Sequence, residues 1–444
     1  MACTAHKTPL LRTVAVRGYA AQAGAKIASK KNLEVETTTL PNKLVVASVE
    51  SNSPISRISI LFRAGSRNET YDNLGATHLI RSTAGISTSK STGFLLTRSI
   101  QQVGGNISVT SDREIIEYNV ELMRDKLDTG LKFLSDVACH TIFKPWDIND
   151  NLYRVKEDLA RVTPQVRAVD LLHRAAFRNG LGNSIFCAKH HVGKLSPETL
   201  QHYLASNYKT SRAAVVGVGV DHQLLVGYAK NLALDSASGT DVASKYYGGE
   251  LRVDKAGNWA HVAVGTQSAG WANPKEALAF ALLQQVAGTG PVTKRGNSGG
   301  ALGKVVGSAL GDKSFGITAL NASYSDDGLF GFVLSAEGGD VGKAIDAAIK
   351  ALKQGSVSNA DVTRAKEQLK AVYLSAYDTD SAIISDMGIQ AVLAGKVASP
   401  SEVIALLDSI TSSDVNAAAK KVASGKWSVG AVGYLANVPY IDQL

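Results

Sequence analysis

The chain has 444 residues, a length that predicts two or more domains rather than a single hydrophobic core. Its formal net charge of +8 comes from basic residues spread among acidic ones, which argues against a nucleic-acid-binding surface, where Lys and Arg cluster among aromatic residues. No apolar run is long enough to cross a bilayer, and the densest, residues 213–220, has the length of one strand.

The first segment, residues 1–19, is basic, rich in hydroxyl side chains and free of acidic residues. This composition is typical of a mitochondrial transit peptide. Arg17 stands three positions before Ala20, a spacing that favours cleavage at the Tyr19–Ala20 bond. We therefore expect the mature chain to begin at Ala20, the alternative being that the segment is only a frayed basic tail.

The remainder of the chain reads as an internal duplication. Each copy begins with an apolar or alternating strand, a turn of small residues and an apolar helix. Two alternating strands and an amphipathic helix follow. Each copy ends with a capped helix and a buried strand. The three matched pairs of segments are 57–85 with 260–288, 106–137 with 316–352, and 194–219 with 409–434. The same order of elements at three matched places predicts two homologous α+β halves.

The boundary between the halves falls in a segment rich in Ser, Gly and Asp. We predict a first half over residues 35–230, a linker over 231–247 and a second half over 248–444. Near the end of each half a helix start is predicted, from Ser196 followed by proline in the first and from a capping box beginning at Thr411 in the second.

The first half contains one segment with the beginning of a metal-binding motif, "GATHLIRSTAG" at 75–85. In the motif H-x-x-E-H, two histidines four residues apart bind zinc from one helical face, and the glutamate is the general base. His78 occupies the position of the first histidine, but Arg81 replaces the glutamate and Ser82 replaces the second histidine. A guanidinium repels a cation and takes no proton from water, so we expect neither metal binding nor catalysis at these positions.

The third ligand of such a site is a carboxylate from a later helix. Glu157 lies close to the expected position, and Lys156 and Leu159 are the alternatives. One histidine and one carboxylate would still leave zinc without a three-ligand catalytic set. His190 and His191 are adjacent in the sequence and cannot share one helical face.

The cysteines Cys3, Cys139 and Cys187 are too few and too scattered for a disulfide framework or a Cys-based zinc site, and they indicate a reducing compartment. Two residues separate Cys187 from His190, but no second pair completes a metal site. We interpret this pair as a core thiol and a surface histidine.

The second half contains two glycine-dependent features. Residues 287–305 are glycine-rich, but their spacing does not match a phosphate-binding loop, and we interpret them as a surface loop; a role in handling presequences is the alternative. Asp326, Asp327 and Gly328 predict a tight hairpin turn in which the glycine takes a positive φ.

The repeated α+β halves, "GATHL" (75–79) and "NASYSDDGLFGF" (321–332) together resemble the mitochondrial processing peptidase family, whose relatives include pitrilysin. The strings "GTGPVTKRGN" (288–297), "GGELR" (248–252) and "NASYSDDGLFG" (321–331) are most similar to the core proteins of this family, the matrix-side scaffold subunits of ubiquinol–cytochrome c reductase, or respiratory complex III. The resemblance implies a pitrilysin-like fold in which each half is a mixed β-sheet packed with helices.

The resemblance also implies a function. We expect a non-catalytic subunit on the matrix side of the mitochondrial inner membrane, needed for assembly of complex III and supporting electron transport from ubiquinol to cytochrome c. The partners implied are core protein 1, a second copy of this same core protein, cytochrome b, cytochrome c1, the Rieske iron–sulfur protein and the small complex III subunits.

No cofactor is expected on this chain, because it lacks C-x-x-C-H and its cysteines cannot assemble a cluster; haem and iron–sulfur would belong to the partner subunits. The alternative function is that of a non-catalytic, peptide-binding subunit in a mitochondrial processing peptidase heterodimer.

Overall fold

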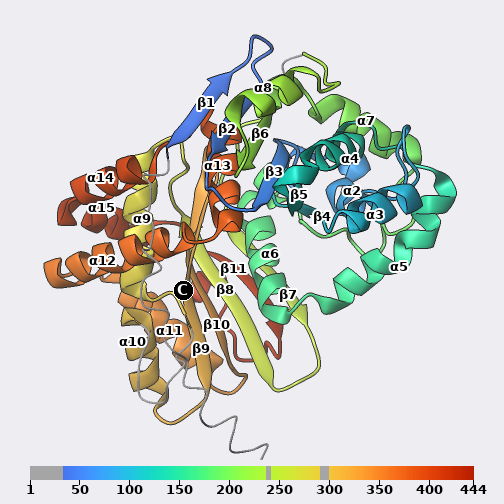
Figure 1. Ribbon diagram of the computed structural model, residues 1–444. Helices are drawn as coiled ribbons and strands as arrows, with labels where there is room; N and C mark the ends of the chain where they lie inside the picture. Colours follow the sequence, from blue (N-terminus) through green and yellow to red (C-terminus); the bar gives the residue numbers. More distant parts are fainter. Residues whose placement is uncertain (1–33, 237–241, 291–299) are drawn as a thin grey trace, which may run out of the picture. The chain divides into compact units, whose positions relative to one another are not determined.

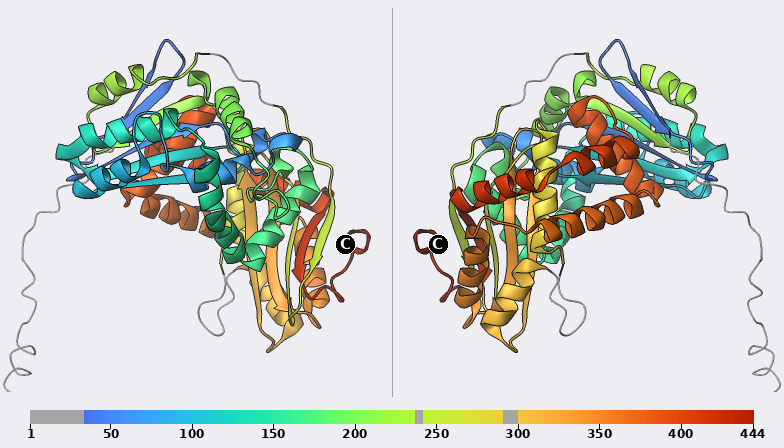
Figure 2. Two further views of the ribbon diagram at one scale, coloured as in Figure 1. Left: turned by 90° about the vertical axis from the view of Figure 1, so that its right-hand side faces the viewer. Right: turned by 90° about the vertical axis from the view of Figure 1, so that its left-hand side faces the viewer.

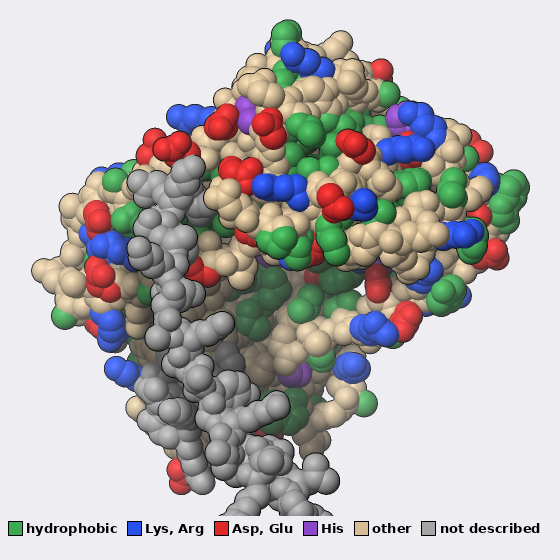
Figure 3. All heavy atoms as spheres, in the orientation of Figure 1, with side chains coloured by type: hydrophobic (Ala, Val, Ile, Leu, Met, Phe, Trp, Pro, Cys, Tyr) green, Lys and Arg blue, Asp and Glu red, His purple; other side chains and the backbone are tan. Residues whose placement is uncertain are grey.

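The computed structural model describes residues 34–236, 242–290 and 300–444 (Figure 1). The predicted transit peptide and its cleavage site lie outside these residues. Residues Val35–Leu444 form one compact unit. Among the described residues, no helix is both long enough and apolar enough to span a membrane. Acidic and basic side chains are interspersed over the face shown in Figure 3, as the scattered charges of the sequence predict.

The first half is built on a six-stranded sheet with the strand order β1-β2-β6-β3-β5-β4. Its strands are β1 (Val35–Thr39), β2 (Val45–Val49), β3 (Ile55–Phe62), β4 (Asn106–Ser111), β5 (Ile116–Met123) and β6 (Ala213–Val218). β2 and β6 run parallel, and every other neighbouring pair is antiparallel. The helices of this half are α2 (Ala76–Thr83), α3 (Gly93–Gln102), α4 (Leu127–Cys139), α5 (Pro145–Arg161), α6 (Pro164–Phe177), α7 (Pro197–Asn207) and α8 (His222–Lys230).

The second half repeats this plan in a five-stranded sheet with the order β7-β11-β8-β10-β9. Its strands are β7 (Gly249–Asp254), β8 (Trp259–Gln267), β9 (Phe315–Ser323), β10 (Gly328–Glu337) and β11 (Ser428–Gly433). β7 and β11 run parallel and the other pairs are antiparallel, so the parallel pair lies at the matching place in both sheets. The helices are α9 (Pro274–Ala287), α10 (Ala301–Leu310), α11 (Val341–Lys353), α12 (Asn359–Ala376), α13 (Asp380–Ala394), α14 (Pro400–Ser409) and α15 (Ser412–Ser424). The predicted architecture, two homologous α+β halves with mixed sheets, is confirmed.

The two predicted helix starts are also confirmed. The Ser196 hydroxyl accepts a hydrogen bond from the Thr199 N–H at 3.2 Å, directly before Pro197 opens α7. At α15, Thr411 and Asp414 form a reciprocal capping box. Each cap satisfies a backbone donor that the first helical turn leaves without a partner, which fixes where the helix begins.

Two helices pack against the sheet of the opposite half. α6 lies against β11, β8 and β7, whereas α13 lies against β6, β3 and β2 (Figures 1 and 2). Glycines allow these close approaches, because a Cβ at Gly430 would lie 2.3 Å from the Ala168 carbonyl oxygen and one at Gly388 would lie 2.6 Å from Leu61 Cδ2. The core of each half is therefore completed by a helix from the other. The chain position at which the halves divide, 231–247, stays a prediction.

The hairpin between β9 and β10 differs from the prediction in one respect. The turn is there, and the Tyr324 N–H donates to the Asp327 carbonyl at 2.9 Å. Gly328, however, does not take a positive φ; it is already the first residue of β10 and pairs with Ser323. Glycine is required for space instead, since a Cβ there would lie 2.5 Å from the Ser268 hydroxyl and 2.7 Å from the Ala269 carbonyl oxygen.

Candidate functional site

The start of α2 places the segment that carries His78. Gly75 takes a left-handed conformation, with φ of 92°, immediately before the helix. The buried carboxylate of Glu69 accepts hydrogen bonds from the N–H groups of Gly75 (2.8 Å) and Thr77 (2.9 Å) and from the Thr77 hydroxyl (2.5 Å). A carboxylate at a helix N-terminus is favourable for the helix dipole. Burial nevertheless raises the pKa of Glu69 to about 7.

The imidazole of His78 is fully buried, and both of its nitrogens have partners. Nδ1 accepts a hydrogen bond from the Cys187 N–H at 3.1 Å, so in the neutral ring the proton must be on Nε2. Nε2 then donates to Asp158 Oδ2 at 3.3 Å. Burial, assisted by the positive charge of Arg81, lowers the pKa of His78 and favours this neutral form.

The two replaced motif positions lie as helical spacing requires, one turn along from His78. An Arg81 Nη atom lies 3.1 Å from the same Asp158 oxygen and forms an ion pair that joins α2 to α5. The Ser82 hydroxyl donates to the His78 carbonyl at 2.8 Å, within its own helix. The carboxylate therefore meets a guanidinium, and the hydroxyl is engaged with backbone.

The carboxylate that reaches His78 belongs to Asp158, and the residue suggested from the sequence, Glu157, points elsewhere. Glu157 pairs with Arg161 at 2.6 Å on the exposed side of α5. Of the two alternatives, Lys156 is exposed and Leu159 is buried in the core. The sequence contained one signal that favours Asp158. Val155 and Leu159 form the apolar stripe by which α5 packs on the core, and Asp158 lies at the border of that stripe.

These residues do not fit a zinc ion. In this hydrogen-bond arrangement Nε2 of His78 carries a proton, so it has no lone pair with which to bind a metal. The nearby carboxylate of Asp158 is neutralised by Arg81. A catalytic zinc needs three protein ligands. In the parts of the chain that the structure describes, no group of three or more His, Cys, Asp or Glu side chains is placed to hold a metal.

An open cavity of about 800 Å³ lies beside this cluster. It is bordered by Arg81 and Asp158, by the edge strand β4, and by Tyr153 and Phe186. A further polar cluster joins the two halves, and no motif in the sequence marks it. Its centre is Arg67, whose guanidinium lies 2.6 Å from Glu114 Oε1 and 2.6 Å from Asp326 Oδ2.

The remaining sequence candidates are Cys187 and the glycine-rich loop. Cys187 is buried against the backbone at Gly75, and burial raises the pKa of its thiol to about 11, which leaves it protonated and unreactive at neutral pH. The glycine-rich loop 287–305 lies partly outside the described residues. Its two described ends lie side by side, since a Cβ on Gly300 would lie 2.5 Å from the Ala287 carbonyl oxygen.

Comparison with known proteins identifies two family models along the chain. Residues 45–189 match the model described as "Insulinase (Peptidase family M16)", and residues 194–369 match the one described as "Peptidase M16 inactive domain". The site described above lies in the first of these segments.

Curated relatives match over nearly the whole chain. The mitochondrial cytochrome b-c1 complex subunit 2 of Homo sapiens is 38% identical over 97% of this chain and 95% of its own length. The corresponding protein of Neurospora crassa is 28% identical over 99% of this chain and 96% of its own. The probable mitochondrial-processing peptidase subunit alpha-1 of Arabidopsis thaliana is 27% identical over 93% of this chain and 84% of its own.

A solved structure shares the fold. A chain of "Complex III2 from Candida albicans, Inz-5 bound" superposes with a TM-score of 0.79 and covers 92% of this chain and 98% of its own length. At 19% identity, this likeness speaks for the fold alone.

Proposed function

The chain belongs to the M16 peptidase family, among the mitochondrial cytochrome b-c1 complex subunit 2 proteins, and we propose that it is a non-catalytic core subunit of mitochondrial ubiquinol–cytochrome c reductase. The observation that carries this proposal is the 38% identity with the human subunit over 97% of the chain. The subunit is a scaffold needed for assembly of the complex, and it supports electron transport from ubiquinol to cytochrome c without handling electrons itself.

The geometry around His78 supports the absence of peptidase activity. In the M16 arrangement the helix of His78 would supply the general base and a second metal ligand. At those positions Arg81 pairs with Asp158 and Ser82 bonds to its own helix, so neither side chain is available for the chemistry. His78, Arg81 and Ser82 are, in this proposal, the remains of a lost zinc site.

The proposed location is the matrix side of the mitochondrial inner membrane. The chain would be held there peripherally, by core protein 1, a second core protein 2, cytochrome b, cytochrome c1, the Rieske protein and the small subunits. Haem and the iron–sulfur cluster would be bound by those partners. The finding that no described helix is suited to span a membrane is compatible with this peripheral attachment.

The alternative is a non-catalytic, peptide-binding subunit of a mitochondrial processing peptidase. The 27% identity with a plant mitochondrial-processing peptidase alpha subunit supports this alternative, but the 38% identity with the human complex subunit is higher.

One purification distinguishes the two functions. The tagged chain is captured from detergent-solubilised mitochondria, and the eluate is examined for haem absorbance and for cleavage of a presequence peptide. We expect b- and c-type haem spectra in a large membrane complex. A haem-free soluble heterodimer that cleaves presequences would contradict the proposal and establish the alternative.

A further inference from the structure

The second sheet has an uncovered edge at a place where the first sheet is covered. β2 and β7 correspond, because each runs parallel to the last strand of its half. β2 is covered by β1, which pairs with it antiparallel from Val35↔Val49 to Thr39↔Val45. No strand among the described residues pairs with the outer side of β7. In Figure 2, β7 forms the outer margin of its sheet.

The chain before β7 cannot form the missing strand, because it is held elsewhere. The Val242 carbonyl accepts a hydrogen bond from Arg67 at 2.8 Å, and the Ser244 N–H donates to Asp326 at 2.7 Å. Further on, the Tyr247 N–H donates to the Ala176 carbonyl at 2.8 Å. These bonds commit the segment to the junction of the two halves, so the hairpin that covers β2 has no equivalent at β7.

The two faces of β7 differ in what they leave available. On one face Leu251, 36% exposed, and Val253, 38% exposed, remain partly open to solvent. On the other, Arg252 donates to the Val438 carbonyl at 3.0 Å, and Glu250 accepts from the Ile441 N–H at 3.0 Å. Glu250 and Arg252 are thus occupied by the C-terminal tail, whereas the opposite face packs in part against α6 and leaves Leu251 and Val253 partly exposed.

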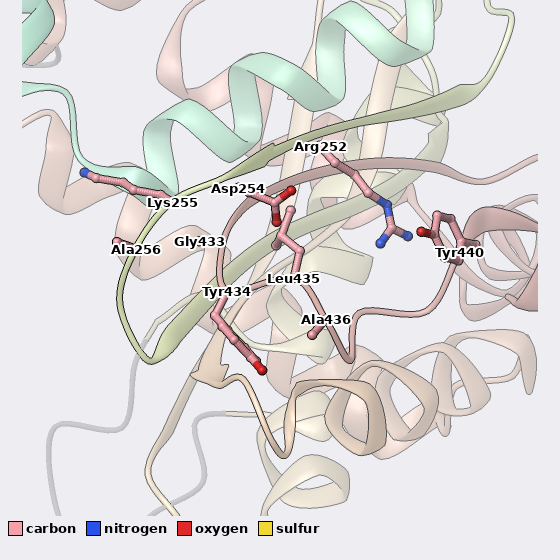
Figure 4. A pocket seen from close by; sticks show the side chains of 9 residues that line it. All are labelled: Arg252, Asp254, Lys255, Ala256, Gly433, Tyr434, Leu435, Ala436 and Tyr440. Atoms are coloured by element: carbon pink, nitrogen blue, oxygen red, sulfur yellow. The ribbon is translucent and has the colours of Figure 1, made fainter.

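A hollow of about 530 Å³ lies at the end of the same strand (Figure 4). Asp254, Tyr434, Leu435 and Tyr440 are among the residues that line it, and the side chain of Lys255 points away from the others. The Asp254 carboxylate has no hydrogen bond or ion pair with any side chain in the described parts of the chain. Arg252 also lines the hollow, but its guanidinium is engaged by the Val438 and Pro439 carbonyls, so the exposed Asp254 carboxylate is left to pair with a cationic group from outside.

We propose that β7 is a docking edge for an extended segment of another complex III subunit, an inference that rests on the proposed function. The segment adds antiparallel to β7, as β1 adds to β2. It carries apolar side chains that cover Leu251 and Val253, and a Lys or Arg whose charge meets Asp254. Backbone hydrogen bonds supply the affinity in this kind of strand addition, and the side-chain contacts supply the specificity.

Hydrogen exchange tests whether the edge is covered. Amide exchange of peptides spanning β7 is compared between the isolated chain and the purified complex, with β11, an interior strand, as the internal control. We expect exchange in β7 to be slowed about tenfold or more in the complex, while β11 is slow in both. If the chain is absent from the haem-containing complex, the proposed function fails. If it is present but β7 exchanges as fast as in the isolated chain, only the docking proposal fails.

Cross-linking tests what covers the edge. A photoreactive residue in place of Leu251 is activated in the assembled complex and the cross-linked peptide is sequenced. We expect an extended, partly apolar segment of a different subunit that contains a Lys or Arg. Cross-links to a second copy of this chain, to its own N-terminal residues or to lipid would overturn the proposal.

A charge-reversal variant tests the chemistry. We expect L251K combined with D254K to reduce incorporation into the complex about tenfold. L251K would bury a charge against the apolar side chains of the docked segment, and D254K would face that segment's Lys or Arg with a like charge. The control is Leu224→Lys, a residue that is 41% exposed on α8 of the first half. Thermal unfolding of the isolated variants is measured in parallel and should match the wild type. Incorporation equal to that of the control would overturn the proposal.

Discussion

At the scale of single residues, an ion pair and a hydrogen bond around His78 connect α2 to α5. The ion pair of Arg81 with Asp158 joins α2 to α5, and His78 donates a hydrogen bond to the same carboxylate. The connection between the two helices is therefore made without metal, by a guanidinium whose charge is permanent.

We expect the purified chain to contain no stoichiometric zinc and to cleave no presequence peptide. The double variant R81E/S82H should remain a poor enzyme, because the supporting residues around a metal site are needed as well as its ligands. Elemental analysis and a peptide cleavage assay check both statements. One zinc per wild-type chain, with cleavage that a chelator abolishes, would refute the loss of the site.

Asp158→Asn should lower the free energy of unfolding by about 0.5–1 kcal/mol. This is the size expected of an ion pair at the surface, because the Asp158 side chain is partly exposed. The variant removes the ion pair with Arg81 and weakens the hydrogen bond from His78. Glu157→Gln is the matched control on the same helix and should have a smaller effect, since its partner Arg161 is 75% exposed. Urea unfolding measures both, and equal effects would show that the α2–α5 connection contributes nothing beyond an ordinary surface pair.

Glu69 should give the unfolding free energy a dependence on pH. Its pKa is about 7 in the folded chain against the usual 4.5, so its proton favours the folded state below pH 4.5, and this contribution is lost as the pH rises through 7. The size is on the order of 3 kcal/mol. Glu69→Gln should remove this part of the slope between pH 5 and 8, and Glu157→Gln should leave it in place. Parallel stability profiles of wild type and E69Q would contradict the prediction.

At the scale of elements, the β9–β10 hairpin packs closely against the chain around Ser268, Ala269 and Gly270. Gly328 faces Ser268, Ala269 and Ala322, and Gly270 faces the peptide at Asp326 with 2.5 Å to a hypothetical Cβ. A turn packed so tightly tolerates no added side chain, whatever its backbone angles.

Gly328→Val should therefore loosen the second sheet by steric overlap, not by backbone strain. We expect less assembled complex III and lower quinol–cytochrome c activity in mitochondria, with nearly unchanged turnover per assembled complex. Gly316→Val, in the neighbouring strand of the same hairpin, is the control, because nothing lies within 4 Å of a Cβ at that position. Full assembly with slower electron transfer per haem would point to a direct catalytic role.

At the scale of the whole molecule, each half of the unit Val35–Leu444 contributes a helix that packs against the sheet of the other half. α6 and α13 each complete the core of the opposite sheet, and Arg67 joins the halves through Glu114 and Asp326. Tyr324 adds a hydrogen bond to His173 at 2.8 Å, and burial holds the pKa of that histidine well below its usual value, so it accepts as a neutral ring.

The second half should consequently fail to fold by itself. A fragment of residues 248–444 lacks α6, whose buried side chains Ala168 and Leu172 pack on β8 and β11, and exposing that face removes a large apolar burial from the fragment. We expect low helical and strand signals by circular dichroism and strong binding of a hydrophobic dye. The full chain, as the control, should unfold in one transition. A stably folded fragment would show that the second half does not need α6 in order to fold.

The sequence by itself determined the duplication, the order of strands and helices, the capped helix starts and the substitution of the metal motif. These follow from patterns within about 30 residues, where side-chain periodicity and local backbone preferences decide the outcome. It also placed the β9–β10 turn, although not the reason for its glycine, because φ at Gly328 depends on the strand pairing that follows.

Only the tertiary structure decided which helix covers which sheet, which carboxylate reaches His78 and which strand edge remains free. The choice of Asp158 over Glu157 depends on how α5 is rotated about its axis, a difference of one residue that packing alone sets. The contacts of α6 with β11, those of α13 with β6, β3 and β2, and the pairing of Arg67 with Asp326 all join residues more than 150 positions apart. Local pattern carries no information about such pairs, since their energy arises only when the whole chain has closed around them.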